Sequence, residues 1–466
     1  MYTFTGSGTK ENIIQTGHIV ITFNDVNNIS IQNRYPETDS EGLSNTDTNS
    51  QMTFTVTSDI TGDTKVNYAL GITDIQEGNT LTQDYIKIYL KKGNNVVAGF
   101  TENKGELIAS FKPLYIENVM TSHVLLTDVI SGSEVHTYTL KAWIDENYKL
   151  PSTENNTNGT HTSNTTSETF KFKIKGYGTT ESIEVIDKSL KGLILGKNNS
   201  NVLNATATLT TDYSSAGDAS GLYKSVDGET NSGRTYFYRG AVTNNYVSFA
   251  GLMWRIVRIN ENGSIRLLLN DGINNNKNYQ FYPSWNNYTY MYYSNSDVEN
   301  GIKRTVDTWY NDNLKTYEDY IADTEFCEQF KVVLNGDYTT VGSVTATTYD
   351  NYTSNFKCST DANGYGIITS KAGLLTYDEA VHAGNYPMKR SNSYIKKSNY
   401  MYWLMSPAGA SNSYGVYTDG TIDILHIVNY STYGYNNVVR PVISLKAGML
   451  ATGSGTSDDP YLIQTR

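Results

Sequence analysis

The chain has 466 residues, of which 38 are tyrosine, and its net charge is −11. The acidic balance and the absence of clustered Lys and Arg exclude a nucleic-acid-binding protein, because phosphate contacts need grouped cations. The hydrophobic share of 38% is low, and the abundance of Tyr, Thr, Ser, Asn and Gly is typical of an extracellular β-rich protein. A chain of this length is long enough for two or three domains.

Residues 1–177 contain short runs in which apolar and polar side chains alternate. Met52, Phe54 and Val56, for example, alternate with threonines. This period of two is typical of antiparallel sheets with one buried face, and short strands separated by turn residues predict a β-sandwich. The segment 151–168 has almost no apolar residue. We therefore predict that it is a mobile surface loop.

Residues 178–216 are predicted to be a linker or transition region, in which Leu190, Leu193, Ile194 and Leu195 indicate a strand or a short helix, and residues 217–466 a second domain. The turn sequence at Asn260–Gly263 predicts a β-hairpin. Two sequences fit a helix capping box, Ser296–Glu299 and Thr376–Glu379, so we expect a helix to begin at each. Strands before and after these helices, with the two ends of the domain pairing, predict an α+β fold.

The chain contains two cysteines, Cys327 and Cys358, which are 31 positions apart. A single pair in a surface-like protein predicts a disulfide. Closing a loop of that length would contribute about 3–4 kcal/mol to stability. The alternative is two unpaired thiols. We expect no metal site there, since no second pair and no histidine lies near in sequence.

The composition changes between two apolar segments, Trp403–Pro407 and Val439–Leu445, which we expect to be buried scaffold. The residues between them are mostly Tyr, Asn, Ser, Thr and Gly, the types that form antibody paratopes. The alternative is that these tyrosines pack on each other or cover the sheet. Aliphatic residues inside the window are predicted to be core: Val416, Ile422, Ile424 and Val428. The predicted ligand-binding residues are Ser411, Asn412, Tyr414, Tyr417, His426, Asn429, Tyr430, Thr432, Tyr433, Tyr435, Asn436 and Asn437.

The start of the chain, Tyr2–Gly6 followed by His18–Phe23, resembles the camelysin and TasA-like β-sandwich proteins of Gram-positive bacterial surfaces and matrices. Any Ig-like sandwich fits the same pattern. The resemblance covers the first third of the chain and implies a stalk or structural domain. It also carries an alternative function, a structural matrix or pilus-like subunit that self-associates through edge strands.

A series of blocks in the second domain resembles a family of bacterial surface-protein domains from Firmicutes, and the α+β plan resembles the C-type lectin-like fold. The blocks are Tyr236–Val247, Trp254–Ile259, Gly373–Glu379, Trp403–Pro407, Val439–Leu445 and Gly453–Leu462. The expected architecture is therefore multidomain, an all-β Ig-like sandwich followed by an α+β C-type lectin-like domain. The resemblance implies a cell-surface ligand-binding protein, adhesin-like or receptor-like, and not an enzyme.

The resemblance extends to ligand-binding proteins that are diversified by retroelements and use the surface before the last strand as a binding platform. Such retroelements mutate adenines, which turns Asn codons into Tyr, Asp, Ser, Thr, His or Ile. The composition of residues 411–437 fits that spectrum and equally fits an ordinary Tyr-rich protein. The implied partner is a protein or glycan ligand on another cell or on a phage.

Two other functions fit the sequence less well than ligand binding does. Calcium-dependent sugar binding needs several converging oxygen ligands. Trp309–Asp312 resembles a calcium-lectin motif only superficially, and Asp419 and Asp423 are predicted turn residues. Formylglycine-generating enzymes share the fold but need a cysteine pair in their C-terminal core. In this chain the last cysteine is Cys358, well before Trp403. The six histidines lie in no HExxH motif, and no GxSxG motif occurs. We expect no catalytic residue, no metal and no cofactor, and a structural role for Arg440.

No apolar run is long enough for a transmembrane helix, and no signal peptide precedes the first predicted strand. Two explanations remain open: the protein is cytosolic, or an export signal and an anchor have been removed from it. The composition favours the second. We therefore expect an extracellular location on a bacterial cell surface, with membrane association only through an anchor missing from this chain.

Overall fold

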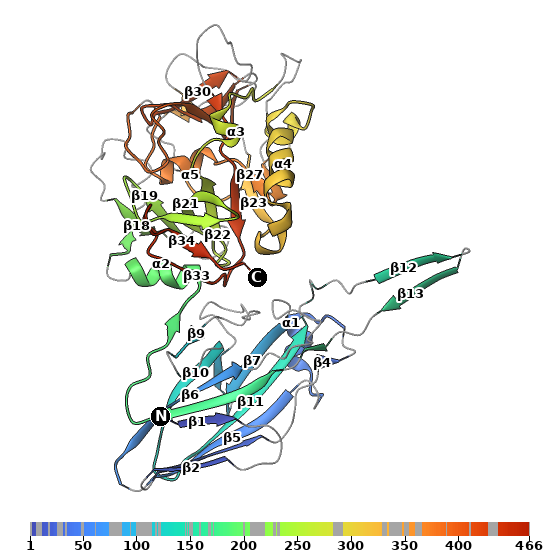
Figure 1. Ribbon diagram of the computed structural model, residues 1–466, viewed down its shortest axis with the longest axis vertical. Coiled ribbons are helices and arrows are strands. Elements are labelled where there is room, and N and C mark those ends of the chain that lie inside the picture. Colours follow the sequence, from blue (N-terminus) through green and yellow to red (C-terminus); the bar gives the residue numbers. More distant parts are fainter. Residues whose placement is uncertain are drawn as a thin grey trace. The chain divides into compact units, whose positions relative to one another are not determined.

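The chain folds into two units that are mostly β, with several sheets and few helices, as the sequence predicts. The units are Met1–Lys188 and Ser189–Arg466 (Figure 1). The computed structural model describes residues 2–465 apart from 6–11, 17–18, 26–30, 33–34, 48–50, 61, 74–85, 94, 99–113, 117–118, 120–122, 145, 147, 149–151, 158–159, 166–168, 171, 199–200, 206–219, 227–229, 231–233, 283–291, 329–332, 335–346, 349–353, 359–365, 388, 410–411 and 427–436.

Two antiparallel sheets form the first unit (Figure 1). The four-stranded sheet has the order β1 (Tyr2–Thr5), β15 (Lys173–Thr179), β6 (Lys65–Thr73) and β10 (His123–Ser131). The six-stranded sheet has the order β2 (Asn12–Thr16), β3 (Ile19–Asp25), β5 (Gln51–Ile60), β11 (Val135–Ile144), β7 (Ile86–Lys92) and β8 (Asn95–Ala98).

One hydrophobic core joins these two sheets. Strand β5 contributes Met52, Phe54 and Val56, which are buried while the intervening threonines are not, as the alternation predicts. Strand β6 of the other sheet contributes Leu70 and Ile72 to the same cluster. Two sheets that share one core bury their apolar faces against each other, which is the physical basis of a sandwich.

A polar network also connects the two sheets. The Asp128 carboxylate on β10 accepts hydrogen bonds from the hydroxyls of Tyr68 and Tyr138, each at 3.1 Å, and from Lys92 at 2.6 Å. Burial alone would raise the pKa of Asp128, but the hydrogen bonds from Lys92 and the backbone of Val129 outweigh it and lower that pKa. The carboxylate is therefore held ionised between the two sheets.

The segment 151–168 contains paired strands, so the prediction of a loop there was wrong. Strands β12 (Ser152–Thr157) and β13 (Thr160–Thr165) form an antiparallel hairpin. Backbone pairing does not require apolar side chains, and the Asn-Gly dipeptide between the strands favours a tight turn.

The smaller elements of this unit are β4 (Ile31–Gln32) with β14 (Thr169–Phe170), β9 (Leu114–Tyr115) with β16 (Ile186–Asp187), and helix α1 (Asp39–Ser44).

A ten-stranded sheet organises the second unit. Its hairpin turns at Asn260–Gly263, as predicted, with Gly263 at a φ of +84° that favours glycine. The first part of the domain pairs with the last part, also as predicted. The strands are β17 (Leu203–Asn204), β18 (Gly221–Lys224), β19 (Tyr236–Arg239), β20 (Tyr246–Phe249), β21 (Leu252–Ile259), β22 (Ile265–Leu269), β27 (Ala372–Gly373), β32 (Val442–Leu445), β33 (Ala451–Thr452) and β34 (Tyr461–Ile463).

The boundary between the units differs from the predicted linker, residues 178–216. Helix α2 (Leu190–Asn198) lies in that range, and its Leu190 and Ile194 side chains are buried in the core of the second unit. Leu190 also donates a backbone hydrogen bond to Met449. Apolar residues at helical spacing thus attach this segment to the domain that follows it.

One of the two predicted capping boxes is present. Thr376 caps helix α5 (Tyr377–His382), and Thr376 and Glu379 exchange both hydrogen bonds of the box at 3.1 Å. The other prediction was wrong, because helix α4 (Ile302–Asn313) begins after Gly301. Ser296 instead ends the short 3-10 helix η2 (Ser294–Ser296), and its buried hydroxyl donates to the Tyr293 carbonyl. The remaining helices are α3 (Ile273–Asn276) and the 3-10 helix η3 (Lys315–Tyr320).

A second, four-stranded sheet lies at the end of this unit opposite α2 and β33 (Figure 1). Its order is β30 (Ile422–His426), β29 (Asn412–Val416), β28 (Met401–Gly409) and β31 (Asn437–Val438). Both predicted scaffold segments, Trp403–Pro407 and Val439–Leu445, are buried.

Two short pairs of strands are also present in this unit, β23 (Thr324–Cys327) with β26 (Ile367–Ser370) and β24 (Val333–Leu334) with β25 (Thr347–Thr348). The predicted disulfide between Cys327 and Cys358 is present.

Truncating the core of the first unit tests this arrangement. We expect Phe54→Ala to lower the free energy of unfolding by about 3–5 kcal/mol, since it removes a buried ring and leaves a cavity. Phe54 stacks on Tyr138 with the ring centroids 5.5 Å apart. Val135→Ala is the control, because Val135 is 59% exposed at the start of β11. Urea denaturation followed by circular dichroism measures both. Equal effects of the two substitutions would contradict the shared core.

Candidate ligand-binding surface

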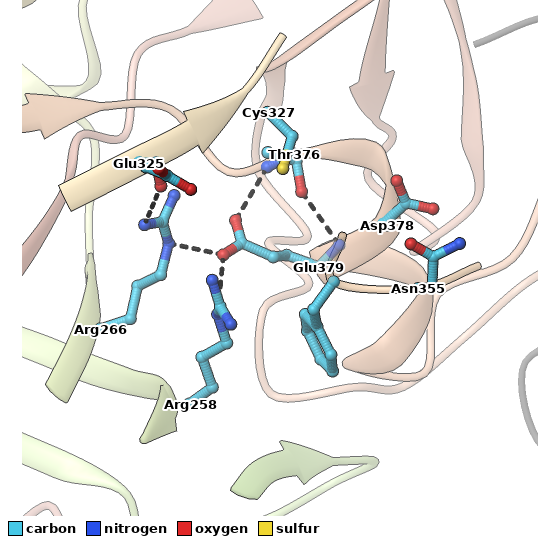
Figure 2. Close-up of a pocket in the computed structure, with 9 residues that line it drawn as sticks. Arg258, Arg266, Glu325, Cys327, Asn355, Thr376, Asp378 and Glu379 are labelled. Atoms are coloured by element: carbon cyan, nitrogen blue, oxygen red, sulfur yellow. Dashed lines mark hydrogen bonds and ion pairs between the residues drawn. The ribbon is translucent and has the colours of Figure 1, made fainter. Parts of the chain in front are cut away.

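Three buried charged side chains meet beside helix α5 (Figure 2). Arg258 on β21 and Arg266 on β22 are direct partners in the hairpin register. Glu379 from α5 places its Oε1 atom 2.5 Å from Nε of Arg266 and 3.4 Å from Nε of Arg258. Like charges directly opposite each other on paired strands repel. The carboxylate of α5 is therefore the nearest counter-charge to both arginines, and Glu261 adds a second one, 3.8 Å from Nη1 of Arg258.

The groups around Arg266 show how its buried positive charge is stabilised. Burial lowers the pKa of Arg266 to about 10, the nearby Glu379 carboxylate opposes that shift, and the positive charge of Arg258 adds to it. The guanidinium also donates to the Glu325 carbonyl at 3.2 Å and lies 4.0 Å from the centroid of the Phe326 ring. Backbone and aromatic groups thus take the place of water around this side chain.

A small cavity adjoins the three charges. Its volume is about 10 Å³, which is room for about one water molecule. It is lined by Arg258, Arg266, Glu325, Cys327, Asn355, Phe356, Thr376, Asp378 and Glu379 (Figure 2). A cavity of this size does not admit a sugar or a peptide side chain, so the arginine pair is part of the scaffold.

A serine, a histidine and an aspartate also lie together at α5, and the sequence patterns did not reveal them. The Ser354 hydroxyl donates to Oδ1 of Asp378 at 2.6 Å, and Nδ1 of His382 lies 2.8 Å from the Asp378 carbonyl oxygen. All three side chains are buried. The hydroxyl is engaged with the carboxylate and is closed off from solvent, so this cluster does not present a nucleophile of the hydrolase type.

Helix α5 also attaches to the four-stranded sheet. The backbone N–H of Tyr377 donates to the Ser406 hydroxyl on β28 at 3.0 Å. The Tyr377 ring packs on Tyr414 of β29, with 4.8 Å between the ring centroids. Arg440 holds the segment before β32, donating to the carbonyls of Leu269 and Ile395 at 3.0 and 2.7 Å. Its predicted structural role is therefore confirmed.

The structure places the predicted binding residues of the four-stranded sheet in two groups. Tyr414 and Asn437 are each only 4% exposed, so their side chains belong to the interior. Asn412 and Tyr417 are half-buried, and the Tyr417 hydroxyl donates to the Ile424 carbonyl at 3.0 Å. The predicted core residues Val416 and Ile422 are buried, and Ile424 is half-buried.

Most of the remaining predicted residues lie outside the described part of the chain. The backbone of His426 ends strand β30. Ser411, Asn429, Tyr430, Thr432, Tyr433, Tyr435, Asn436 and the predicted core residue Val428 are not among the described residues. Strands β30 and β31, which flank residues 427–436, show where the two ends of this segment lie. His426 pairs with Asn412 at one end of the sheet, whereas Asn437 pairs with Met401 at the other.

The acidic residues considered for calcium have local roles. The Asp419 carboxylate accepts a hydrogen bond from the Thr421 N–H at 3.0 Å, and Asp423 accepts one from the Ile424 N–H at 2.7 Å. Trp309 and Tyr310 of the other candidate motif are buried in α4. Within the described residues, no three His, Cys, Asp or Glu side chains are grouped so that they could hold a metal ion.

Comparisons with known proteins found no match, neither to a family model nor to a curated protein or a solved structure. Among the described residues, no helix combines the length and the apolar character needed to cross a bilayer.

Removing the central carboxylate tests the charge balance. We expect Glu379→Gln to lower the free energy of unfolding of the second unit by about 3 kcal/mol or more, because it removes the carboxylate nearest to both buried arginines and leaves Arg258 with Glu261 at 3.8 Å. Glu299→Gln removes an exposed carboxylate from the same unit and should change stability by less than about 0.5 kcal/mol. Urea denaturation of both variants decides the question. Similar effects would show that Glu379 does not balance the pair.

The stability of the second unit should depend on His382. Burial lowers the pKa of His382 to about 4, from an ordinary value of 6.5. The folded state therefore favours the neutral ring, and its contribution is complete above about pH 6.5 and is lost as the pH falls towards 4. Going from pH 7 to pH 5 should cost about 2 kcal/mol through this group. Denaturation of His382→Gln should lack that part of the pH dependence; an unchanged dependence would contradict the assignment.

Proposed function

We propose that this is a ligand-binding protein of a bacterial cell surface, adhesin-like or receptor-like, in which residues 411–437 form the recognition surface. The observation that carries the proposal is that a segment with paratope composition is attached at both ends to one packed sheet, at β30 and at β31. Binding groups work best when a rigid scaffold holds the chain that presents them.

The scaffold beneath this segment is well packed. Strand β28, at the centre of the sheet beside β29 and β31, is buried over Met401–Ala408. The carbonyl of Leu375 accepts a hydrogen bond from the Met405 N–H at 2.8 Å, which fixes β28 to the chain just before α5. A sheet held in this way limits the conformations of the segment joined to it, which lowers the entropic cost of binding.

The proposed architecture is an Ig-like sandwich that acts as a stalk and a C-type lectin-like domain that presents the surface. The first part is supported by the two antiparallel sheets around one core. The second is supported by the pairing of the first and last parts of the domain, the intervening helices α4 and α5, and a separate sheet that carries the candidate segment.

The burial of individual side chains reduces the set of residues that we propose as ligand contacts. Tyr414 and Asn437 serve as supports, since their side chains are in the interior. At the margin, Asn412 and Tyr417 remain half-buried. Oδ1 of Asn412 is a buried acceptor with no hydrogen-bond partner within the described part of the chain. The other proposed contacts are Ser411, His426, Asn429, Tyr430, Thr432, Tyr433, Tyr435 and Asn436.

The proposed mechanism is recognition by shape and hydrogen bonding. Tyrosine offers a large flat contact area at a low cost in side-chain entropy, and asparagine, serine and threonine adapt their hydrogen bonds to the partner. The partner is a protein or a glycan on another cell or on a phage. An extracellular position is consistent with the composition and with the disulfide.

A glycan and protein array probed with the full chain tests this function. We expect the triple variant Tyr430→Ala, Tyr433→Ala and Tyr435→Ala to lose at least about tenfold in affinity for any ligand found, because aromatic anchors dominate such interfaces. Tyr35→Ala is the matched control, since Tyr35 is a 77% exposed tyrosine of the first unit. Full binding by the triple variant would place the site elsewhere.

Targeted diversification of this segment makes a separate genomic prediction. If a retroelement diversifies residues 411–437, the source genome should carry a near-repeat of the encoding DNA beside a reverse transcriptase gene. The differences between the two copies should fall at adenines. Sequencing the locus checks this. A locus without the repeat would contradict diversification, and the proposed ligand binding would then use a surface of fixed sequence.

A further inference from the structure

The disulfide holds a short segment, Ser354–Cys358, against helix α5; we call this segment the strap. We propose that the strap is a redox-sensitive latch, which covers the charged centre of Arg258, Arg266 and Glu379 while the Cys327–Cys358 bond is intact and releases it when that bond is reduced. Asn355, Phe356 and Cys327 line the cavity beside these charges, so the strap forms part of its wall (Figure 2).

The strap touches α5 and its neighbours through two side chains. The Ser354 hydroxyl donates to the Asp378 carboxylate at 2.6 Å. The Phe356 ring lies 3.9 Å from the ring of His382, centroid to centroid, and 4.8 Å from the Arg258 guanidinium. Phe356 therefore excludes water from one arginine of the centre and from the histidine of α5.

The disulfide is the covalent part of this attachment. Strap residues belong to neither a helix nor a strand. The bond ties the strap to Cys327 at the end of β23, a strand whose Phe326 packs beneath Arg266. Breaking it would free a loop of 31 positions, whose regained conformational entropy favours detachment.

The bond is also within reach of a reductant, since both cysteines are half-buried rather than enclosed. A thiolate of a small dithiol attacks one sulfur, the Cys327–Cys358 bond breaks, and a mixed disulfide forms. The second thiol of the reagent then closes a cyclic disulfide. The protein gains two electrons and two protons as two cysteine thiols, and the dithiol is oxidised.

Release of the strap would change the environment of α5. Water would reach Arg258 and Glu379 and screen their attraction. The helix would lose its hydrogen bond from Ser354 and the ring that covers His382. Because α5 has only the six residues Tyr377–His382, these tertiary contacts rather than its own hydrogen bonds hold it in place.

Hydrogen–deuterium exchange of the full chain tests the latch with dithiothreitol as the reductant, near neutral pH. We expect the amides of the strap and of α5 to exchange at least about tenfold faster after reduction, while those of β21 and β22 keep their protection. Mass spectrometry confirms that two hydrogens were gained, and reoxidation should restore slow exchange. Unchanged exchange in α5 with the bond broken would overturn the proposal. Loss of protection across the whole second unit would also overturn it, because the bond would then be a general staple.

Two variants separate the covalent contribution from the packing contribution. The double variant Cys327→Ala and Cys358→Ala should show fast exchange in α5 without reductant and no response to it. Phe356→Ala, with the disulfide intact, should speed exchange in α5 by a smaller factor. If the double variant does not fold, the reduction of the wild-type chain decides alone. A double variant that folds with α5 as protected as in the oxidised protein would overturn the latch.

Discussion

The ion pair between Glu379 and Arg266 is the contact on which the second unit depends. The hairpin of β21 and β22 places Arg258 and Arg266 opposite each other, and neither is solvated by bulk water. A carboxylate between them offsets part of the cost of burying both charges. It comes from α5, whose own first turn is completed by the same side chain through the capping box with Thr376. A single glutamate therefore takes part both in the start of a helix and in the attachment of that helix to the sheet.

Other buried arginines extend this principle. Arg239 donates to the carbonyls of Val381 and His382 at the end of α5, and its guanidinium lies 5.3 Å from the Tyr386 ring centroid. Arg440 lies 4.6 Å from the ring centroid of Tyr402. In each case backbone carbonyls and a tyrosine face take the place of water around the cation. Some of the tyrosines of this chain thus help to bury charged donors.

Buried tyrosines also explain why composition alone did not separate supporting residues from contact residues in the segment 411–437. Tyr414 lies in a window of paratope-like residues, yet it packs on Tyr377 in the interior. Periodic patterns were more informative, since the alternation in β5 predicted which side chains are buried and Thr376–Glu379 predicted the start of α5. The same four-residue spacing failed at Ser296, whose hydroxyl bonds to the preceding turn. The contacts of Glu379 with the two arginines join residues more than a hundred positions apart, and no local pattern encodes them.

The second unit begins and ends at one place. The backbone N–H of Leu190 donates to the carbonyl of Met449 at 2.7 Å, and β33 pairs with the last strand, β34. Neighbouring entry and exit points make a domain portable. Such a domain can be inserted into a loop of an unrelated protein, because its two ends lie close together and the host backbone does not have to stretch to reach them. The unit carries its own strand pairing at that junction.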